Sequence, residues 1–103
     1  MPTVDTIRKN LEPVFSSYKV RKAILFGSFA KGTARENSDI DIYVESGLKG
    51  LSFYGLLEDV VNCLERPVDL IDASQVKPES KIMSEIIKTG VVIFNGREIY
   101  NAG

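Results

Sequence analysis

The chain has 103 residues, of which 44% are hydrophobic and 26% charged, and this composition predicts one globular domain over residues 1–103 with a modest apolar core. The formal net charge is −1, so no general attraction to nucleic acid or to an anionic membrane surface is expected. The absence of histidine excludes Ser-His-Asp triads and histidine-ligated zinc, which leaves carboxylates as the strong ligands and bases.

The N-terminal half alternates between helix and strand. An apolar helical stripe begins after Thr3, a predicted N-cap, and Pro13 is expected to kink or break that helix. Residues 20–26 (VRKAILF) predict a strand that ends at Gly27. Residues 39–45 (DIDIYVE) have period two, so one side of this strand is expected to face the core. The polar side would then carry Asp39, Asp41, Tyr43 and Glu45.

The C-terminal half repeats the alternation. A helical stripe over 53–64 ends before Pro67, and residues 68–72 (VDLID) predict a third strand. Residues 78–90 predict a helix that closes on Gly90. The side chains that this helix is expected to bury are Ile82, Met83, Ile86 and Ile87. Residues 91–100 (VVIFNGREIY) predict two short strands about an Asn-Gly turn. Together these elements predict a small α/β domain with a sheet of three to five strands.

The strand that ends at Gly27 passes directly into Ser28 and the short stretch FAKG. Such a turn can present backbone N–H groups at the start of a helix to a phosphate, and the serine hydroxyl adds a further donor. Glycine permits a close approach of the ligand. The alternative is that Gly27 only turns the chain and that Ser28 only caps a helix. These two residues do not by themselves decide between the alternatives.

Three aspartates stand in apolar strands. Asp39 and Asp41 share a face with α-carbons roughly 6.5 to 7 Å apart, so both carboxylates can converge on one divalent ion or on two neighbouring ions. Asp69 lies inside PVDLI, where burial would be costly unless a cation were bound beside it. The alternatives are a solvated edge strand for the pair and a turn or edge position for Asp69. Combined with the glycine-serine turn, the three acids predict a two-metal site for phosphoryl transfer.

The stretch GSFAKGTARENSDIDIYV resembles the signature of the polymerase-beta-type nucleotidyltransferases, and the whole chain is similar to their minimal branch, the MNT-domain proteins. The resemblance implies a palm-like α/β fold with a mixed sheet flanked by helices. It implies that two Mg²⁺ ions and the triphosphate of ATP are bound. The implied metal-binding and catalytic residues are Asp39, Asp41 and Asp69, and the implied triphosphate-binding residues are Gly27, Ser28 and Lys31. Lysine at position 31 replaces the arginine of many relatives, which keeps the charge but not the bidentate geometry.

In the resembled family, members that act on nucleic acid or on antibiotics carry an additional domain that holds the acceptor. No such domain is recognised in this chain, so the acceptor of the nucleotide is expected to be another protein. The resemblance implies transfer of AMP to a tyrosine of a HEPN-domain ribonuclease toxin, with this chain as the antitoxin. One alternative is transfer to a small molecule such as an aminoglycoside, in a pocket built by oligomerisation. Another is a binding module that masks a toxin without catalysis. No apolar run of signal or membrane-spanning length is present, so a cytoplasmic location is expected.

Overall fold

The computed structural model describes residues 1–97, and its centre is a four-stranded sheet. The elements are α1 (Val4–Ser17), β1 (Lys22–Phe26), α2 (Ser28–Lys31), β2 (Ile40–Glu45), α3 (Leu51–Leu64), β3 (Val68–Asp72), the 3-10 turn η1 (Ala73–Gln75), α4 (Lys81–Thr89) and β4 (Val91–Asn95). The strand order is β3-β2-β1-β4, with β1 antiparallel to both neighbours and β2 parallel to β3. The predicted α/β fold with a mixed sheet of three to five strands is confirmed.

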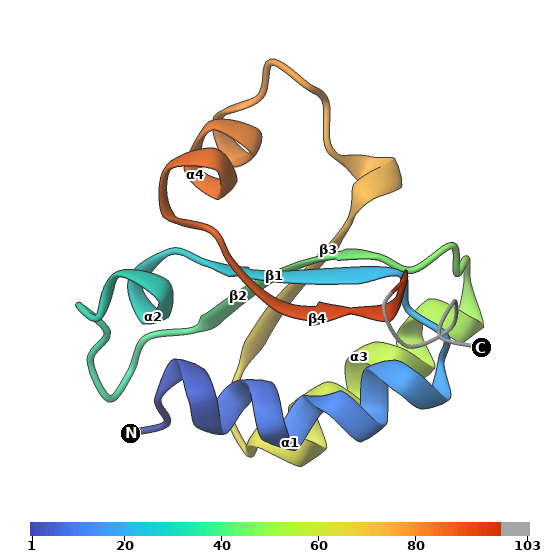
Figure 1. Cartoon of the computed structure of the whole chain (residues 1–103), viewed down its shortest axis with the longest axis horizontal. Coiled ribbons are helices and arrows are strands. Elements are labelled where there is room, and N and C mark those ends of the chain that lie inside the picture. The colour runs from blue at the N-terminus through green and yellow to red at the C-terminus, as the bar shows by residue number, and fades with distance from the viewer. Residues whose placement is uncertain (98–103) are drawn as a thin grey trace.

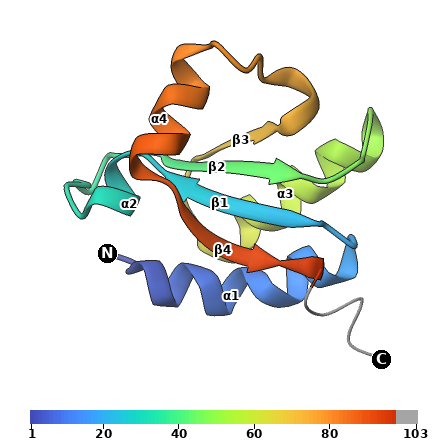
Figure 2. The same ribbon diagram turned by 45° about the horizontal axis from the view of Figure 1, so that its top comes forward.

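The helices lie in layers on the two faces of the sheet. In Figure 1, α1 and α3 lie below the sheet and α4 lies above it. Figure 2 shows the same arrangement after the top has turned forward, with α2 beside the end of β1. None of the helices within residues 1–97 combines the length and the apolar character needed to cross a bilayer.

The apolar core fills the space between the sheet and the pair α1 and α3. Its fully buried side chains come from both helices, from the two central strands and from the link between α1 and β1, because the apolar stripe of each helix faces the same side of the sheet. The largest of them are Phe15, Ile7, Leu11, Leu25, Ile40, Ile42, Leu56, Val20, Val44 and Val60. The predicted alternation along β2 is confirmed, since Ile40, Ile42 and Val44 are buried and the residues between them are partly exposed. The polar side of β2 therefore faces away from the core.

Helix α1 begins as predicted, with the Thr3 hydroxyl accepting a hydrogen bond from the backbone N–H of Thr6 at 3.2 Å. Pro13 does not break the helix, which continues to Ser17. Proline removes one backbone donor from a helix interior. Pro13 lies on the exposed side of α1, where water can replace that donor.

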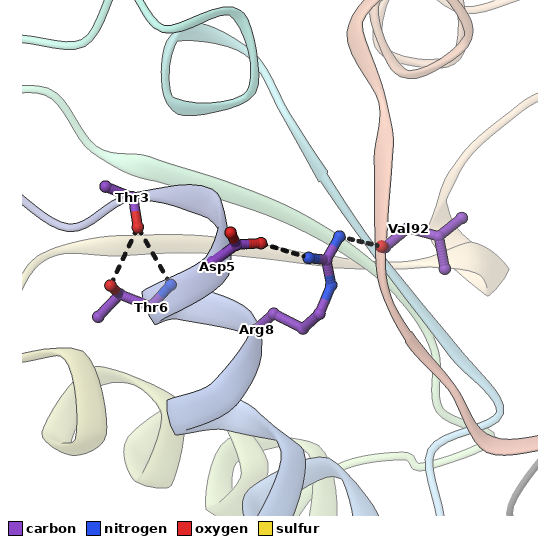
Figure 3. A network of polar contacts seen from close by, with 5 residues as sticks. All are labelled: Thr3, Asp5, Thr6, Arg8 and Val92. Carbon is purple, nitrogen blue, oxygen red and sulfur yellow. Dashed lines mark hydrogen bonds and ion pairs between the residues drawn. The ribbon is translucent and has the colours of Figure 1, made fainter.

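A polar network near the start of α1 connects this helix to the edge strand β4 (Figure 3). The guanidinium of Arg8 donates to the carboxylate of Asp5 at 2.8 Å and to the backbone carbonyl of Val92 at 3.1 Å. The helix is thus attached to the sheet through a main-chain atom at the strand edge, in addition to its apolar face.

Helix α4 is more exposed than its apolar pattern predicts. Ile86 is buried as expected, but Ile82 is 41% exposed and Ile87 is 76% exposed. The prediction for these two residues is wrong because α4 is the only long helix on its side of the described sheet, so no second helix covers its outer surface. Periodicity identifies an apolar stripe but does not give the number of neighbours.

The chain ends α4 at Gly90 and enters β4 at once. Gly90 is the C-cap as predicted, but its φ is −62°, outside the left-handed region that usually selects glycine. A Cβ atom there would collide with the carbonyl oxygen of Ile86 and lie 2.8 Å from Cγ2 of Ile24. Close packing therefore requires the glycine. The predicted Asn95-Gly96 hairpin turn is not formed, since Gly96 and Arg97 are helical, and its second strand lies outside the described residues.

Candidate active site

Strand pairing brings Asp41 and Asp69 side by side. These residues are directly opposite each other in the parallel ladder of β2 and β3, so both side chains lie on the same face of the sheet. Asp39 precedes β2 and lies two residues before Asp41, in a segment where the N–H of Ile40 bonds to the carbonyl of Pro67 at 3.1 Å. The three aspartates therefore share the sheet face opposite the core. Their role as metal ligands stays a prediction.

The three aspartates differ in exposure. β3 is an edge strand, and both Asp69 and Asp39 are exposed, whereas Asp41 on the inner strand β2 is partly buried. The expectation that Asp69 carries a burial cost is therefore wrong, and the alternative of an edge position is correct. An edge position exposes a side chain to solvent even when its sequence neighbours are apolar. The main electrostatic cost falls on Asp41.

Burial and, after it, the negative charges of Asp69, Asp39 and Glu85 raise the pKa of Asp41 from 3.8 to about 6. No hydrogen bond from residues 1–97 reaches the Asp41 carboxylate to offset this cost. A carboxylate that is partly desolvated, surrounded by like charge and without donors has the environment in which a cation is most strongly stabilised.

The donor set fits a hard divalent cation, since Mg²⁺ prefers carboxylate oxygens and retains water. Within residues 1–97, however, no three acidic, histidine or cysteine side chains lie close enough together to form a ready metal-binding group. The carboxylates of Asp39, Asp41 and Asp69 thus share a face without converging.

Gly27 follows β1 and lies against Asp41. Its φ of 75° and ψ of −152° are accessible to glycine and strained for other residues. A Cβ atom at this position would collide with a carboxylate oxygen of Asp41, so the glycine is required by the close approach as well. The backbone N–H of Gly27 donates to the hydroxyl of Thr89 at 3.0 Å. This N–H is therefore bonded within the protein.

Ser28 and Lys31 begin and end the single turn of α2, next to Gly27. The Ser28 hydroxyl is partly exposed and makes no hydrogen bond to residues 1–97, so it can donate to a ligand. The Lys31 ammonium lies 3.8 Å from a carboxylate oxygen of Glu85 on α4, with both side chains about half exposed. The structure thus brings the three predicted phosphate-binding residues to the side of the sheet that carries the aspartates.

Two residues of α4 belong to this neighbourhood and were not predicted as site residues. Glu85 contributes to the raised pKa of Asp41, and Thr89 binds the turn at Gly27. Their spacing of four residues places them on one face of a helix, which is a local signal. Which face of α4 meets the turn depends on tertiary contacts far apart in the sequence. The pattern alone could not identify either residue.

Comparisons with known proteins give the family. The model of the family described as polymerase beta, nucleotidyltransferase, matches residues 9–99. A relative from Methanocaldococcus jannaschii that carries the name of a protein adenylyltransferase, MJ1215, is 36% identical over 74 residues, which cover 70% of this chain and 86% of the relative. The protein adenylyltransferase MntA of Shewanella oneidensis is 38% identical over 56 residues, covering 52% of this chain and 40% of MntA.

Solved structures share the fold. A structure named as a minimal nucleotidyltransferase is 26% identical and superposes with a TM-score of 0.65, covering 87% of this chain and 95% of that one. A chain from the complex of a tri-AMPylated Shewanella oneidensis HEPN toxin with an MNT antitoxin is 17% identical, with a TM-score of 0.69 over 96% of this chain and 78% of that one. With the family model matching residues 9–99, this chain belongs to the polymerase beta nucleotidyltransferase family.

Proposed function

We propose that this protein is a cytoplasmic, Mg²⁺-dependent protein adenylyltransferase that transfers AMP from ATP to a tyrosine of a HEPN-domain toxin and thereby acts as its antitoxin. The main observation behind the proposal is that Asp41 pairs with Asp69 across β2 and β3 and that Gly27 lies against the Asp41 carboxylate. The chain belongs to the nucleotidyltransferase family, which supports the same reaction. The names of the relatives, MntA among them, support a protein acceptor. The complex of an MNT antitoxin with an AMPylated HEPN toxin supports the kind of partner.

In this proposal Asp39, Asp41 and Asp69 would hold two Mg²⁺ ions, which would neutralise charge on the triphosphate and lower the pKa of the attacking hydroxyl. The Ser28 hydroxyl donates to a phosphate oxygen. Lys31 exchanges its half-exposed contact with Glu85 for the stronger charge of the triphosphate. Glycine at position 27 lets the backbone of the turn lie directly against the Asp41 carboxylate, which keeps the turn and this carboxylate close together.

The edge position of Asp69 supports a macromolecular acceptor. An exposed carboxylate on an edge strand can be reached by a side chain that projects from the surface of another protein. A tyrosine suits this geometry, because a phenol with a pKa of about 10 ionises far more readily than an alcohol. The phenol oxygen attacks the α-phosphorus, the bond from that phosphorus to the bridging oxygen breaks, and pyrophosphate leaves. Asp69 accepts the proton of the phenol.

Co-expression with a HEPN-domain candidate partner tests the proposal, with the partner weighed by intact mass spectrometry. The wild type should add AMP to the partner, and the Asp41→Asn and Asp69→Asn variants should add none while they still co-purify with it. Glu12→Gln is the matched control, because Glu12 is an exposed acid on α1, remote from the aspartate face.

Three results would contradict the proposal. AMP addition that persists with Asp41→Asn would remove the catalytic role of the aspartates. Protection of growth by the wild type without any added AMP would favour masking of the toxin by contact. Transfer of labelled AMP to an aminoglycoside in the absence of a partner would favour a small-molecule acceptor.

A further inference from the structure

The hydroxyl of Thr89 links the end of α4 to the turn at Gly27. It donates to the backbone carbonyl of Glu85 at 2.8 Å and accepts from the backbone N–H of Gly27 at 3.0 Å. A threonine hydroxyl has one proton to donate, and here it is donated to the backbone carbonyl of Glu85. The oxygen lone pairs remain available to accept from the N–H of Gly27. The bond is partly buried and joins residues 62 positions apart.

The sheet does not hold Gly27 in place. The ladder between β1 and β2 ends at the pair Phe26 and Asp41, and the ladder between β1 and β4 ends at Leu25 and Val91. Gly27 lies beyond the end of both ladders, and its N–H has no strand partner among residues 1–97. The hydrogen bond to Thr89 takes the place that a ladder bond would have.

Thr89 and Asp41 fix Gly27 from different elements. The hydroxyl of Thr89 on α4 binds the amide of Gly27, and the carboxylate of Asp41 on β2 lies where a Cβ atom of residue 27 would be. The next residue, Gly90, donates its N–H to the Ile86 carbonyl at 2.7 Å, and a Cβ atom there would collide with that carbonyl and with the side chain of Ile24. The position of the turn relative to the aspartate face therefore depends on α4.

The second contact between α4 and this turn is weaker. Lys31 and Glu85 are 3.8 Å apart and both about half exposed, and an ion pair of that kind contributes little to the position of a segment. Thr89 therefore provides the main polar attachment of α4 to the start of α2.

We propose that Thr89 is a positioning residue for nucleotide transfer, which sets the place of Gly27 and Ser28 relative to Asp41 through the amide of Gly27. The inference rests on the proposed function, because the ligand that the turn receives is the triphosphate. It assigns the Gly27 N–H to the protein itself. The donors left for the triphosphate at this turn then include the Ser28 hydroxyl and exclude the Gly27 amide.

A pair of substitutions isolates the hydroxyl of Thr89. Thr89→Val keeps the shape and removes the acceptor of the Gly27 N–H, whereas Thr89→Ser keeps the hydroxyl. Ser17→Ala is the matched control, since within residues 1–97 the hydroxyl of Ser17, at the end of α1, bonds only to the Val14 carbonyl of its own helix, at 2.9 Å. The measurements are amide hydrogen exchange at Gly27 by NMR, without nucleotide, and the Kd for MgATP.

In Thr89→Val the Gly27 amide should exchange about tenfold faster or more, and MgATP should bind about tenfold more weakly, because the turn is no longer held in place. Thr89→Ser and Ser17→Ala should match the wild type in both measurements. The melting temperature of each variant shows that the comparison is made between folded proteins.

Equal protection of Gly27 in Thr89→Val and in the wild type would overturn the inference, and so would weakened MgATP binding in Thr89→Ser equal to that in Thr89→Val. If the wild type bound MgATP and Thr89→Val bound it equally well, the role of Thr89 would fall while the proposed function stood. If the wild type bound no MgATP, the proposed function itself would fall.

Discussion

Asp41 and Asp72 are carboxylates on neighbouring strands of one sheet, and their surroundings are opposite. Asp72, at the end of β3, is only 5% exposed and accepts four hydrogen bonds. Two come from the N–H and the hydroxyl of Ser46, at 3.1 and 2.6 Å, and two from the same groups of Ser74, at 3.0 and 2.6 Å. Asp41 receives none from residues 1–97 and lies beside other acids.

The pKa values of Asp41 and Asp72 shift in opposite directions because only Asp72 accepts hydrogen bonds from residues 1–97. Burial alone would raise the pKa of Asp72, but the hydrogen bonds from Ser46 and Ser74 outweigh burial and hold the pKa below 3.8. For Asp41, burial and like charges act together and raise the pKa to about 6. Burial therefore does not distinguish a structural carboxylate from a ligand-binding one. The number of hydrogen bonds that the protein donates to the carboxylate distinguishes the two.

The largest expected effect separates the two residues by activity. Asp41→Asn should lower AMP transfer by about a thousandfold or more, since it removes a carboxylate to which the proposed function assigns a metal ion. Folded Asp72→Asn protein should transfer AMP as fast as the wild type, so that any loss of activity equals the loss of folded protein. Single-turnover transfer of labelled AMP, corrected for the folded fraction, measures both. A loss in folded Asp72→Asn as large as in Asp41→Asn would break the comparison.

The next effect separates them by stability. Asp72→Asn should lower the free energy of unfolding by about 1 to 3 kcal/mol, because the amide NH₂ would face donors in place of one carboxylate oxygen. Asp41→Asn should raise the stability of the metal-free protein at neutral pH, because it removes a partly buried charge among like charges. Urea unfolding in EDTA measures both variants. A less stable Asp41→Asn variant would contradict this assignment.

A pH series sharpens the same contrast. The folded pKa of Asp41, about 6, lies above the unfolded value of 3.8, so the folded metal-free protein binds more protons between these values and loses stability as pH rises through them. Asp72 has a lowered pKa, so its contribution is present above 3.8 and is lost as pH falls below it. The stability gain of Asp41→Asn should grow from pH 4 to pH 7 in thermal melts. A gain that is constant with pH would refute the assignment.

The smallest effect ranks the neighbours of Asp41. Asp69 contributes more than Asp39 to the raised pKa of Asp41. Asp69→Asn should therefore lower that pKa further than Asp39→Asn does, which carboxyl NMR titration of the metal-free protein can follow. Equal shifts would mean that the register of β2 and β3 does not set the strength of the interaction.

The parts of the fold that depend on local pattern were predictable. The alternation along β2 gave both its buried side and its aspartate side, and the helical stripe over 53–64 gave α3 nearly to its ends. Exposure was not predictable in the same way. Ile87 fits the stripe of α4 but lies on an outer surface, and Asp69 is exposed because β3 is an edge strand.

The part of the candidate site that lies within one continuous sequence motif was predictable. Gly27, Ser28 and the pair Asp39 and Asp41 come from one continuous stretch, and the fold brings them to one side of the sheet. The hydrogen bond from Gly27 to Thr89 joins residues 62 positions apart, and the local pattern of α4 does not show which segment the face with Thr89 contacts. Contacts of this kind follow from tertiary packing alone.

The Arg8 contact with Val92 has a consequence for the behaviour of the protein in concentrated solution. Within residues 1–97, β4 is an edge strand of the sheet, and the exposed main-chain groups of an edge can pair with a strand from another molecule. The guanidinium of Arg8 occupies the Val92 carbonyl at 3.1 Å, while Asp5 orients that guanidinium at 2.8 Å. One main-chain group of this edge is thus already bonded to a charged side chain, which discourages edge-to-edge aggregation.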